Sequence, residues 1–503
     1  MYITILISLA VFAAVLLPLV KPLQSIAYLY GLAVSAIIFL IFVLMAFSWD
    51  MDSTAPYQFA ETYSWIPQLG ISYAVGLNGM SLVMVGLSTF LVPIVFLAAR
   101  DELAEESTHR AAGYVAWVLF LEAIMIGIFA ARDVFLFYVL FELMIIPVFF
   151  LIGRYGGENK RHASIKFLLY SLLGGLVMLV GVVAIFAYNG NGGDSPSYLI
   201  ENLSVPGVIP GNAQMWMFIT FFIAFAIKAP MFPVHTWLPD TTAQARPGTS
   251  TLLVGVLDKI GAYGMIAFCL PLFPDASRDA RLVIMVLAVI SIIWGGFMAI
   301  GSQNLMRLIA YTSVSHFGFM ILGIFSGSET AMKGAILYMV AHGVATGALF
   351  LTVGFLGRRG GNYEISTYGG YKRVTPLIAG VFLVSGLATI AMPGLSGFVP
   401  EVMVLMGTFS VHHGLGIAAV FGMLLAALYL LWPYQKVFTG EKPEIEKPDM
   451  NTSERVVSAI LIAAMLYLGF APSGALSVIE PVAKQSAQYL VVDDSLNVEG
   501  SAK

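Results

Sequence analysis

Charged side chains are scarce in this sequence. Of its 503 residues, only 11% are Asp, Glu, Lys or Arg, whereas 59% are hydrophobic. A soluble globular domain carries about 25% charged residues, so this chain has too little charge to cover a water-facing surface of its size. The composition therefore argues against an ordinary soluble protein and predicts that lipid surrounds most of the molecule.

Cysteine is nearly absent as well, and the only one, Cys269, lies in an apolar run. One thiolate cannot hold an iron–sulfur cluster, a structural zinc ion or an internal disulfide bond. No P-loop or dinucleotide-binding motif stands in a strand–turn–helix context. We therefore expect no cofactor and no redox or nucleotide chemistry in this chain. The net charge of −4, without a basic block, argues against nucleic acid as a partner.

Long apolar runs dominate what is present. A run of about twenty residues can span a bilayer, and the runs predict an all-α integral membrane protein. The first run has no basic residue before it, so we interpret it as a retained helix rather than a signal peptide. About fourteen transmembrane helices are expected, near residues 2–20, 25–48, 78–99, 112–131, 134–153, 165–188, 214–234, 248–270, 282–301, 305–325, 331–357, 374–410, 414–436 and 452–472.

Lysine and arginine are distributed unevenly between the two sets of loops. Seventeen of the 25 lie in odd-numbered loops, six lie in even-numbered loops or the C-terminal tail, and the other two lie inside spans. Loops rich in basic residues remain in the cytoplasm. The sequence therefore predicts a multi-pass protein with both termini on the non-cytoplasmic side of the membrane.

Seven titratable residues lie inside the predicted spans, where an ionised side chain is costly and indicates a functional site by default. The structural alternative is that they form separate buried ion pairs or hydrogen bonds or, for Glu401, that it lies exposed to solvent at a helix end. A relay of titratable groups through the membrane explains all seven with one idea. They are Glu122, Glu142, Lys228, Lys259, His316, His342 and Glu401.

Lys228 is followed by Pro230 and Pro233, each of which removes a backbone donor and breaks a helix. Broken backbone at membrane depth is tolerated only inside protein or beside a water-filled cavity. A lysine at such a break is suited to proton exchange, although it could instead form a structural ion pair with Glu142. Glu142 has no cation three or four residues away on its own helix, so any partner must come from another helix.

Glu401 repeats this pattern, because Pro393 and Pro400 precede it in another long apolar segment. Lys228 and Glu401 then each fall in the fourth helix of a five-helix block. Five is odd, so consecutive blocks have opposite orientations, as in the inverted repeats of secondary transporters. We predict N-terminal helices in 1–110, two repeats in 111–270 and 281–437, and a last helix and tail in 438–503.

His316 and His342 titrate near neutral pH and suit a proton shuttle, although a lone buried histidine is often simply hydrogen-bonded. No second His, Cys or carboxylate stands at ligand spacing on either helix, so no metal site is expected. Asp258 and Lys259 are adjacent and point about 100° apart on a helix, so they need not pair with each other. Asp258 could instead tune Lys259 or pair with Arg246.

Five motifs follow one another along the chain: Phe-Glu-Leu-Met-Ile-Ile-Pro (141–147), Lys-Ala-Pro-Met-Phe-Pro-Val-His-Thr-Trp-Leu-Pro-Asp (228–240), Arg-Leu-Ile-Ala-Tyr-Thr-Ser-Val-Ser-His-Phe-Gly (307–318), Ala-His-Gly (341–343) and Pro-Gly-Leu-Ser-Gly-Phe (393–398). With these motifs the chain resembles the antiporter-like membrane subunits of respiratory complex I, the proton-translocating NADH:quinone oxidoreductase. The resemblance covers roughly residues 75–470.

The resemblance implies a role for each titratable residue. A glutamate at the exit position is typical of the M-type chain (mitochondrial subunit four type), whereas most members carry lysine there. An apolar residue is usual at position 258. The matching residues are Glu142 and Lys228 in the coupled pair, Lys259, His316 and His342 in the central relay, and Glu401 at the exit. Glu122 and His235, together with the departing residue Asp258, are expected to be coupling or auxiliary groups.

The resemblance further implies a non-redox subunit of a translocase in the bacterial cytoplasmic membrane. Its partners would be other membrane-arm subunits of complex I, including neighbouring antiporter-like chains. Protons would pass through it, whereas NADH oxidation and quinone reduction would take place elsewhere in the complex.

Three alternatives stay open. A subunit of a multisubunit cation/proton antiporter or of a membrane-bound hydrogenase would share the fold and most of the motifs. A stand-alone solute transporter would need more Asn, Gln or Ser in its spans. A structural scaffold would gain nothing from so many buried charges, which are costly in a membrane.

Overall fold

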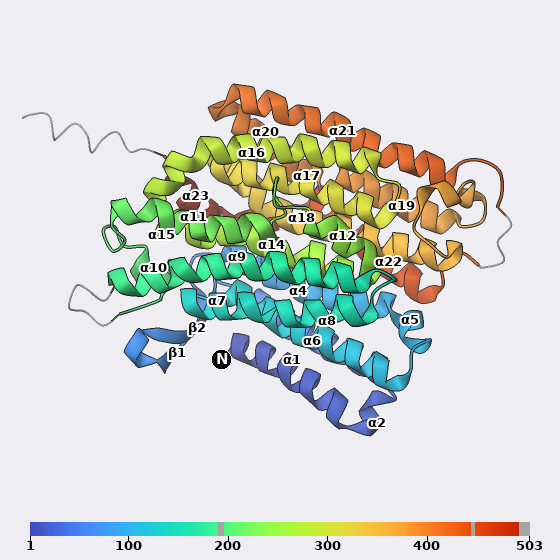
Figure 1. Ribbon diagram of the computed structural model, residues 1–503, viewed down its shortest axis with the longest axis horizontal. Coiled ribbons are helices and arrows are strands. Elements are labelled where there is room, and N and C mark those ends of the chain that lie inside the picture. Colours follow the sequence, from blue (N-terminus) through green and yellow to red (C-terminus); the bar gives the residue numbers. More distant parts are fainter. Residues whose placement is uncertain (190–195, 444–447, 492–503) are drawn as a thin grey trace, which may run out of the picture.

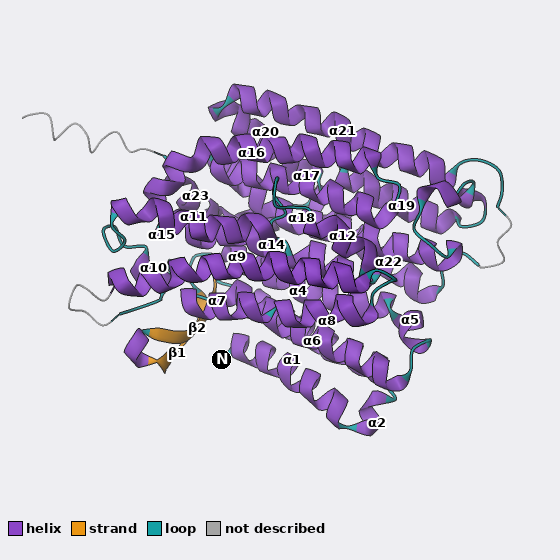
Figure 2. Cartoon of the chain, in the orientation of Figure 1, coloured by secondary structure: helices purple, strands orange, loops and turns teal. Residues whose placement is uncertain are grey.

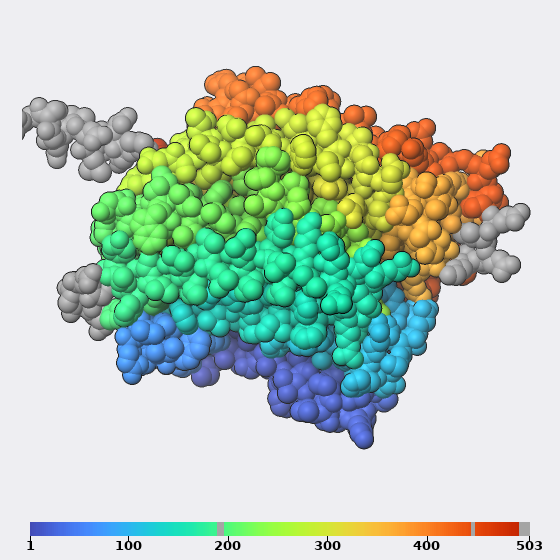
Figure 3. Space-filling model, in the orientation of Figure 1, coloured from blue at the N-terminus to red at the C-terminus, as the bar shows by residue number. Residues whose placement is uncertain are grey.

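The structure is a computed structural model, and it describes residues 1–189, 196–443 and 448–491. Long helices lie side by side with their axes in one common direction (Figure 1). On the face shown in Figure 3, the chain passes in sequence order from the N-terminal helices at one edge to residues 413–438 at the other. Within the described part, the only strands form one short hairpin (Figure 2).

The N-terminal part contains the hairpin, a 3-10 turn and five α-helices. Strands β1 and β2 are antiparallel, and Gly70 adopts a left-handed conformation (φ 71°) in the turn between them. Asn78 then starts the next long helix, because its side chain accepts a hydrogen bond from the Ser81 N–H at 2.9 Å. The elements are α1 (Tyr2–Leu19), α2 (Lys21–Gln24), α3 (Ala27–Phe47), β1 (Gln58–Ile66), η1 (Pro67–Leu69), β2 (Ile71–Leu77), α4 (Gly79–Ala98) and α5 (Arg100–Ala104).

The predicted first repeat forms the next group of helices. A bend at Met144 divides one predicted span into two helices, and a break after Lys228 divides another. The elements are α6 (Thr108–Ala130), α7 (Val134–Leu143), α8 (Ile145–Tyr155), α9 (Lys160–Asn189), α10 (Ile200–Leu203), α11 (Gly211–Lys228), α12 (Trp237–Gln244), α13 (Pro247–Leu252), η2 (Leu253–Leu257), α14 (Lys259–Gly264), η3 (Met265–Cys269) and α15 (Leu270–Leu272).

The predicted second repeat is followed by two C-terminal helices. One of these, α23, packs against α4 and α18. The elements are α16 (Pro274–Gly301), α17 (Leu305–Phe325), α18 (Glu329–Gly360), η4 (Ile365–Thr367), η5 (Tyr371–Arg373), α19 (Pro376–Thr389), α20 (Phe398–Val411), α21 (His413–Phe438), α22 (Thr452–Phe470) and α23 (Ser473–Gln488).

Twelve helices of the described residues are long and apolar enough to cross a membrane. Outer helices such as α3 and α21 expose large apolar side chains, including Leu44 and Leu424, to the surroundings. By contrast, α17 and α18 are almost wholly buried. The predicted span 374–410 contains two shorter helices, α19 and α20, whereas the predicted span 214–234 ends within the break between α11 and α12. A count of fourteen requires α11–α12 and α19–α20 to count as one crossing each, so it stays a prediction.

Both helix breaks that the prolines predict are present. Residues 229–236 separate α11 from α12, and residues 390–397 separate α19 from α20. In the second break, Gly394 has a positive φ of 87°. Pro400, however, lies inside the first turn of α20, where an N–H has no helical partner to lose. The expectation that Pro400 belongs to the break was therefore wrong, and Glu401 lies just inside the helix that follows it.

The segment Pro247–Leu272 departs from plain helix in a way that the sequence did not predict. Two π-helical turns, η2 and η3, flank the short helix α14. One sign of the wider turn is the bond from the Asp258 N–H to the Leu253 carbonyl, five residues back, at 3.0 Å. Such turns occur frequently at functional sites. Here they place Asp258 and Lys259 at the junction between two kinds of helix, deep inside the bundle.

Candidate functional site

Lys259 lies at the start of α14 and is fully buried. Its ammonium nitrogen, Nζ, lies 2.7 Å from Nδ1 of His342 on α18. It also donates to the Val254 carbonyl in the preceding π-helical turn. When Lys259 is charged, its ammonium can only donate, so Nδ1 of His342 then accepts and the histidine proton resides on Nε2.

A continuous set of hydrogen bonds leads from the second histidine to Glu401. Nδ1 of His316 lies 2.6 Å from the Tyr338 hydroxyl, which donates to Oε2 of Glu401 at 2.6 Å. Because Tyr338 gives its only proton to the carboxylate, its oxygen accepts from Nδ1–H of His316. Nε2 of His316 then accepts from the Tyr429 hydroxyl at 3.0 Å. All four side chains are buried.

His342, which contacts Lys259, and His316, which contacts Tyr338, lie next to each other. The ring centroids of His316 and His342 are 5.3 Å apart. Nε2 of His342 has no hydrogen-bond partner among the described residues. Transfer of a proton between the rings therefore requires a bridging water molecule or a rotation of one ring. Five buried side chains from four helices thus form a line through the protein. In spatial order they are Lys259, His342, His316, Tyr338 and Glu401.

Lys228 and Glu142 both pack against α9, one helical turn apart. The Lys228 ammonium donates to Ser171 at 3.4 Å and lies 4.9 Å from the centre of the Phe167 ring. The Glu142 carboxylate lies against Gly175, where a Cβ atom would collide with it. Within the described chain, no ion pair joins Lys228 to Glu142. The simple structural ion pair between these two residues is therefore not what the structure contains.

Asp258 is fully buried next to Lys259. Neither of its carboxylate oxygens has a hydrogen-bond partner in the described ranges. Its carboxyl group is near enough to interact electrostatically with both Lys228 and Lys259. It does not pair with Arg246, as the sequence allowed, because Arg246 forms an ion pair with Glu106. A carboxylate between two buried lysines couples the charge of one to that of the other.

The remaining two predicted site residues are buried but stand apart from this set of contacts. His235, between α11 and α12, stacks on Phe232 with ring centroids 6.0 Å apart. Glu122, on α6, is completely buried, and neither carboxylate oxygen has a partner in the part of the chain that the structure describes. The structure brings neither residue into direct contact with the other predicted site residues.

Two tyrosines of the site escaped the sequence analysis. Tyr338 precedes His342 by four residues, so both lie on one face of a single helix, and this spacing was a usable signal. Tyr429, on α21, carries no comparable signal, because only the packing of α21 against α16 and α20 brings it to His316. A tyrosine hydroxyl is uncharged, so it does not stand out in an apolar span as a lysine or a glutamate does.

Ion pairs gather at the end of the bundle where α5 and α12 lie. Burial raises the pKa of the Glu102 carboxyl there, against the lowering effect of Arg246 and Arg358. These contacts fasten α18 to α5 and α22, and they hold the α12–α13 turn. The pairs are Arg358–Asp101 at 2.9 Å, Arg359–Glu454 at 2.7 Å and Arg246–Glu106.

Comparison with known proteins gives one consistent family. A family model described as NADH:quinone oxidoreductase/Mrp antiporter, transmembrane, matches residues 131–426. NADH-quinone oxidoreductase subunit M of Mycobacterium tuberculosis is 39% identical, over 94% of this chain and 91% of the relative. The subunit M of Rhodobacter capsulatus is 36% identical, over 90% of this chain and 88% of the relative.

Solved structures agree. A chain of respiratory complex I from Thermus thermophilus with bound NADH superposes with a TM-score of 0.88 at 30% identity, over 98% of this chain and 100% of that one. A chain of the Mrp complex from a Dietzia species gives a TM-score of 0.84 at 21% identity, over 99% of this chain and 98% of that one. The second likeness shows the fold alone.

Proposed function

The chain belongs to the family of antiporter-like membrane subunits shared by NADH:quinone oxidoreductases and Mrp antiporters, and on this premise we propose that it moves protons as the M-type subunit in the membrane arm of complex I. The observation that carries the proposal is the line of buried groups from Lys259 to Glu401. We infer that the energy for this transfer comes from redox chemistry elsewhere in the complex.

The hydrogen bonds from Nδ1–H of His316 to Tyr338 and from Tyr338 to Glu401 already point in the direction in which a proton must move to reach Glu401. Nε2 of His316 can take up a proton once the Tyr429 hydroxyl turns away from it; Nδ1–H then passes to Tyr338, whose own proton passes to Glu401. Lys259 supplies the proton to His316 through His342. Lys259 then takes up a new proton from the direction of Lys228. Asp258 interacts with both lysines, so a change in the charge of Lys228 alters the interaction of Asp258 with Lys259. A change in the Glu142–Lys228 interaction starts the sequence.

The energy scale is adequate for work against a membrane potential. Moving one elementary charge across 100 mV costs about 2.3 kcal/mol. Removing one partner from a buried ion pair costs about 3–5 kcal/mol. A change of this size in one electrostatic interaction is therefore enough to drive one proton across a typical potential, and we infer that the interaction of the half-buried Glu142 with Lys228 supplies it.

We further infer that residues 111–270 and 281–437 form two inverted repeats, between N-terminal helices in 1–110 and a last helix and tail in 438–503. In support, the fourth element of each block is a broken helix, α11–α12 in one and α19–α20 in the other. The basic loops support an orientation in the bacterial cytoplasmic membrane with both termini outside. Neighbouring antiporter-like chains are the expected partners, and Glu122, buried on α6, is a candidate for coupling to them.

Lys228→Ala and Glu142→Ala at the chromosomal locus test the proposal in the assembled complex. NADH oxidation and proton pumping are measured in inverted membrane vesicles. Collapse of both activities, with the complex still assembled, supports coupled proton transfer through these residues. Loss of Na⁺/H⁺ exchange with both activities untouched would instead assign the chain to a cation/proton antiporter.

A further inference from the structure

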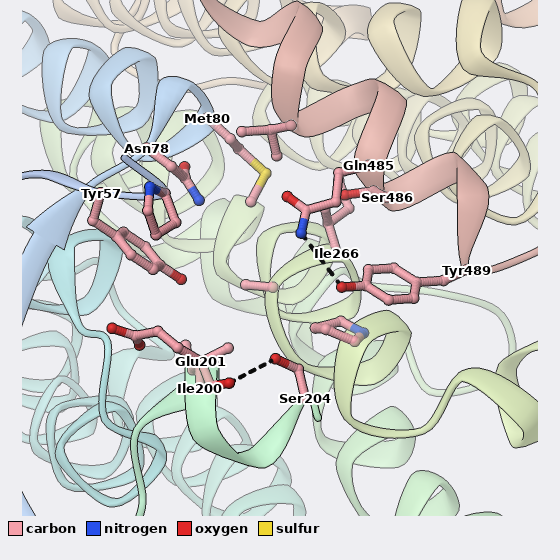
Figure 4. Close-up of a pocket in the computed structure, with 14 residues that line it drawn as sticks. Tyr57, Asn78, Met80, Ile200, Glu201, Ser204, Ile266, Gln485, Ser486 and Tyr489 are labelled. Carbon is pink, nitrogen blue, oxygen red and sulfur yellow. Dashed lines mark hydrogen bonds between the residues drawn. The ribbon is translucent and has the colours of Figure 1, made fainter. Parts of the chain in front are cut away.

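Two cavities at different ends of the helix bundle differ in chemical character. One lies where the β1–β2 hairpin and α10 meet α23, and Tyr57, Asn78, Glu201 and Gln485 line it (Figure 4). Such polar groups suit bound water. The other has a volume of about 490 Å³ and lies between α1, α6 and α8, near the end of the bundle that carries α2 and α5 (Figure 1). Its lining is mainly apolar, so the two cavities suit different occupants.

The second cavity, here called the α1–α6 groove, is lined by residues within 14–19 of α1 and within 109–120 of α6, and by Arg154 of α8. Every lining residue of α1, and all but one of α6, is apolar or a glycine. Two of those on α1, Val15 and Leu19, are 53% and 72% exposed. Because α1 is long and apolar enough to cross a membrane, these exposed side chains face lipid or another membrane protein. An apolar ligand can therefore reach the groove from the membrane.

The α6 wall of the groove follows one helical face. His109, Ala112, Ala116 and Phe120 line it at spacings of three, four and four residues. Phe120 follows His109 by eleven residues, which is a rise of about 16 Å at roughly 1.5 Å per residue. One leaflet contains about 15 Å of hydrocarbon, half of a core about 30 Å thick. The groove therefore runs the depth of one leaflet, as the acyl chain of a phospholipid does.

Basic side chains gather at the end of the groove where α6 begins and α8 ends. Arg154 lines the groove there, and its backbone carbonyl accepts hydrogen bonds from the Arg110 guanidinium at 3.1 Å and the Lys160 ammonium at 3.4 Å. Glu106 pairs with Arg110 at 2.8 Å and offsets one of these three charges. Among the described residues, no carboxylate forms an ion pair with Arg154 or Lys160. Two positive charges therefore remain uncompensated at this end.

The charge at this end selects among lipid headgroups. Arg154 is exposed, so its guanidinium is accessible for the two parallel hydrogen bonds that arginine forms with a phosphate. A zwitterionic headgroup brings its own ammonium together with its phosphate, and the two uncompensated cations repel that ammonium. An anionic headgroup has no such group, and each nearby lysine or arginine adds to its attraction. The basic end therefore favours an anionic phospholipid.

We propose that the α1–α6 groove binds one anionic phospholipid, with an acyl chain along Ala112, Ala116 and Phe120 and its phosphate at Arg154. The headgroup is a phosphodiester without an amine, and the second acyl chain lies in the surrounding bilayer. The bound lipid fills the space between α1 and α6, so it joins the N-terminal helices to the first predicted repeat. The inference needs only a chain embedded in a membrane, and it is independent of the proton path.

Photolabelling of the assembled complex tests the site. The purified complex is reconstituted in phosphatidylcholine vesicles that contain a small share of phosphatidylglycerol with a diazirine on one acyl chain, and mass spectrometry identifies the labelled peptides after illumination. The proposal predicts label on residues 112–120, and several-fold less label there when the same share of phosphatidylcholine carries the diazirine instead. Residues 417–428 of α21, which expose Ile417, Leu424 and Leu428, should be labelled equally by both lipids.

Arg154→Gln tests the headgroup contact. It should lower the labelling of the groove by phosphatidylglycerol about fivefold, the size expected when one basic residue near an anionic lipid is lost. Arg154→Lys keeps the charge and should retain most of the label. Arg373→Gln is the matched control, because Arg373 is also exposed at this end of the bundle and has no ion pair in the described ranges. It should leave the labelling of the groove unchanged.

Ala116→Phe tests the acyl-chain contact by filling the groove, and it should lower the labelling there several-fold. Ala418→Phe is its matched control, because Ala418 is likewise a partly buried alanine on an outer helix, α21. Native gel electrophoresis checks that each variant complex assembles. If Ala116→Phe does not assemble, Arg154→Gln decides, since residue 154 is exposed.

The labelling pattern separates the possible occupants. Equal labelling of residues 112–120 by the two lipids would overturn the proposal, as would full labelling in Arg154→Gln. Label on α21 with none in the groove would show that another subunit fills it, and the proposal would then be wrong. Proton pumping plays no part in these outcomes, so the lipid site can fail while the proposed function stands, and Lys228→Ala can refute the proposed function while the lipid site stands.

Discussion

Tyr338→Phe is the most informative single change, because it removes one oxygen and keeps the ring. That oxygen lies 2.6 Å from Nδ1 of His316 and 2.6 Å from Oε2 of Glu401. Without it, neither Nδ1 of His316 nor Oε2 of Glu401 retains the hydroxyl group that joins them. The link between the histidine and the exit residue is then broken.

The size of the effect follows from the lost hydrogen bond. A bond to a charged group contributes about 1.5–3 kcal/mol, and each 1.4 kcal/mol in a barrier changes a rate about tenfold. Proton transfer to Glu401 should therefore slow roughly ten- to hundredfold. Pumping is measured by quenching of a pH-sensitive dye in proteoliposomes that contain the purified complex.

Tyr114→Phe is the matched control for this measurement. Its buried hydroxyl has one weak contact, to Thr249 at 3.4 Å, and lies away from the line of buried groups. It should pump as the unmodified complex does. Unchanged pumping in Tyr338→Phe, or an equal loss in both variants, would refute the reasoning.

Two further changes test packing rather than proton transfer. Gly175→Ala should lower pumping, because its Cβ collides with the Glu142 carboxylate, whereas Gly174→Ala meets only side-chain and backbone carbons at 3.2 Å or more and should be tolerated; dye quenching in the same vesicles compares them. Glu454→Ala should destabilise the subunit by about 3–5 kcal/mol, because it leaves the buried Arg359 guanidinium without its partner. The melting temperature of the complex checks this, and NADH oxidation per assembled complex should stay the same.

Much of the fold was predictable because a membrane imposes a simple rule on sequence. Apolar runs of sufficient length predicted most helices, and prolines beside Lys228 and Glu401 predicted both broken ones. Bends with no proline at the bend itself were not predictable in this way. The π-helical turns around Lys259 arise from packing, and nothing in the residues 253–257 or 265–269 distinguishes them from ordinary helix.

The charged members of the site were predictable for the same reason, since a titratable group in lipid stands out. Their partners were not. Glu142 lies against Gly175 rather than on Lys228, and Asp258 faces two lysines rather than Arg246. The Tyr338 hydroxyl connects His316 to Glu401, and the Tyr429 hydroxyl bonds to the other ring nitrogen of His316. Such contacts depend on which helices are neighbours, and one sequence does not contain that information.

Glu401→Gln tests the central claim most directly. Glutamine preserves the shape of the side chain and can still accept the bond from Tyr338, but it cannot take up and release a proton. The measurement is the number of protons pumped per NADH oxidised by the purified complex in proteoliposomes. The account predicts a lower ratio with normal assembly, and an unchanged ratio would contradict it.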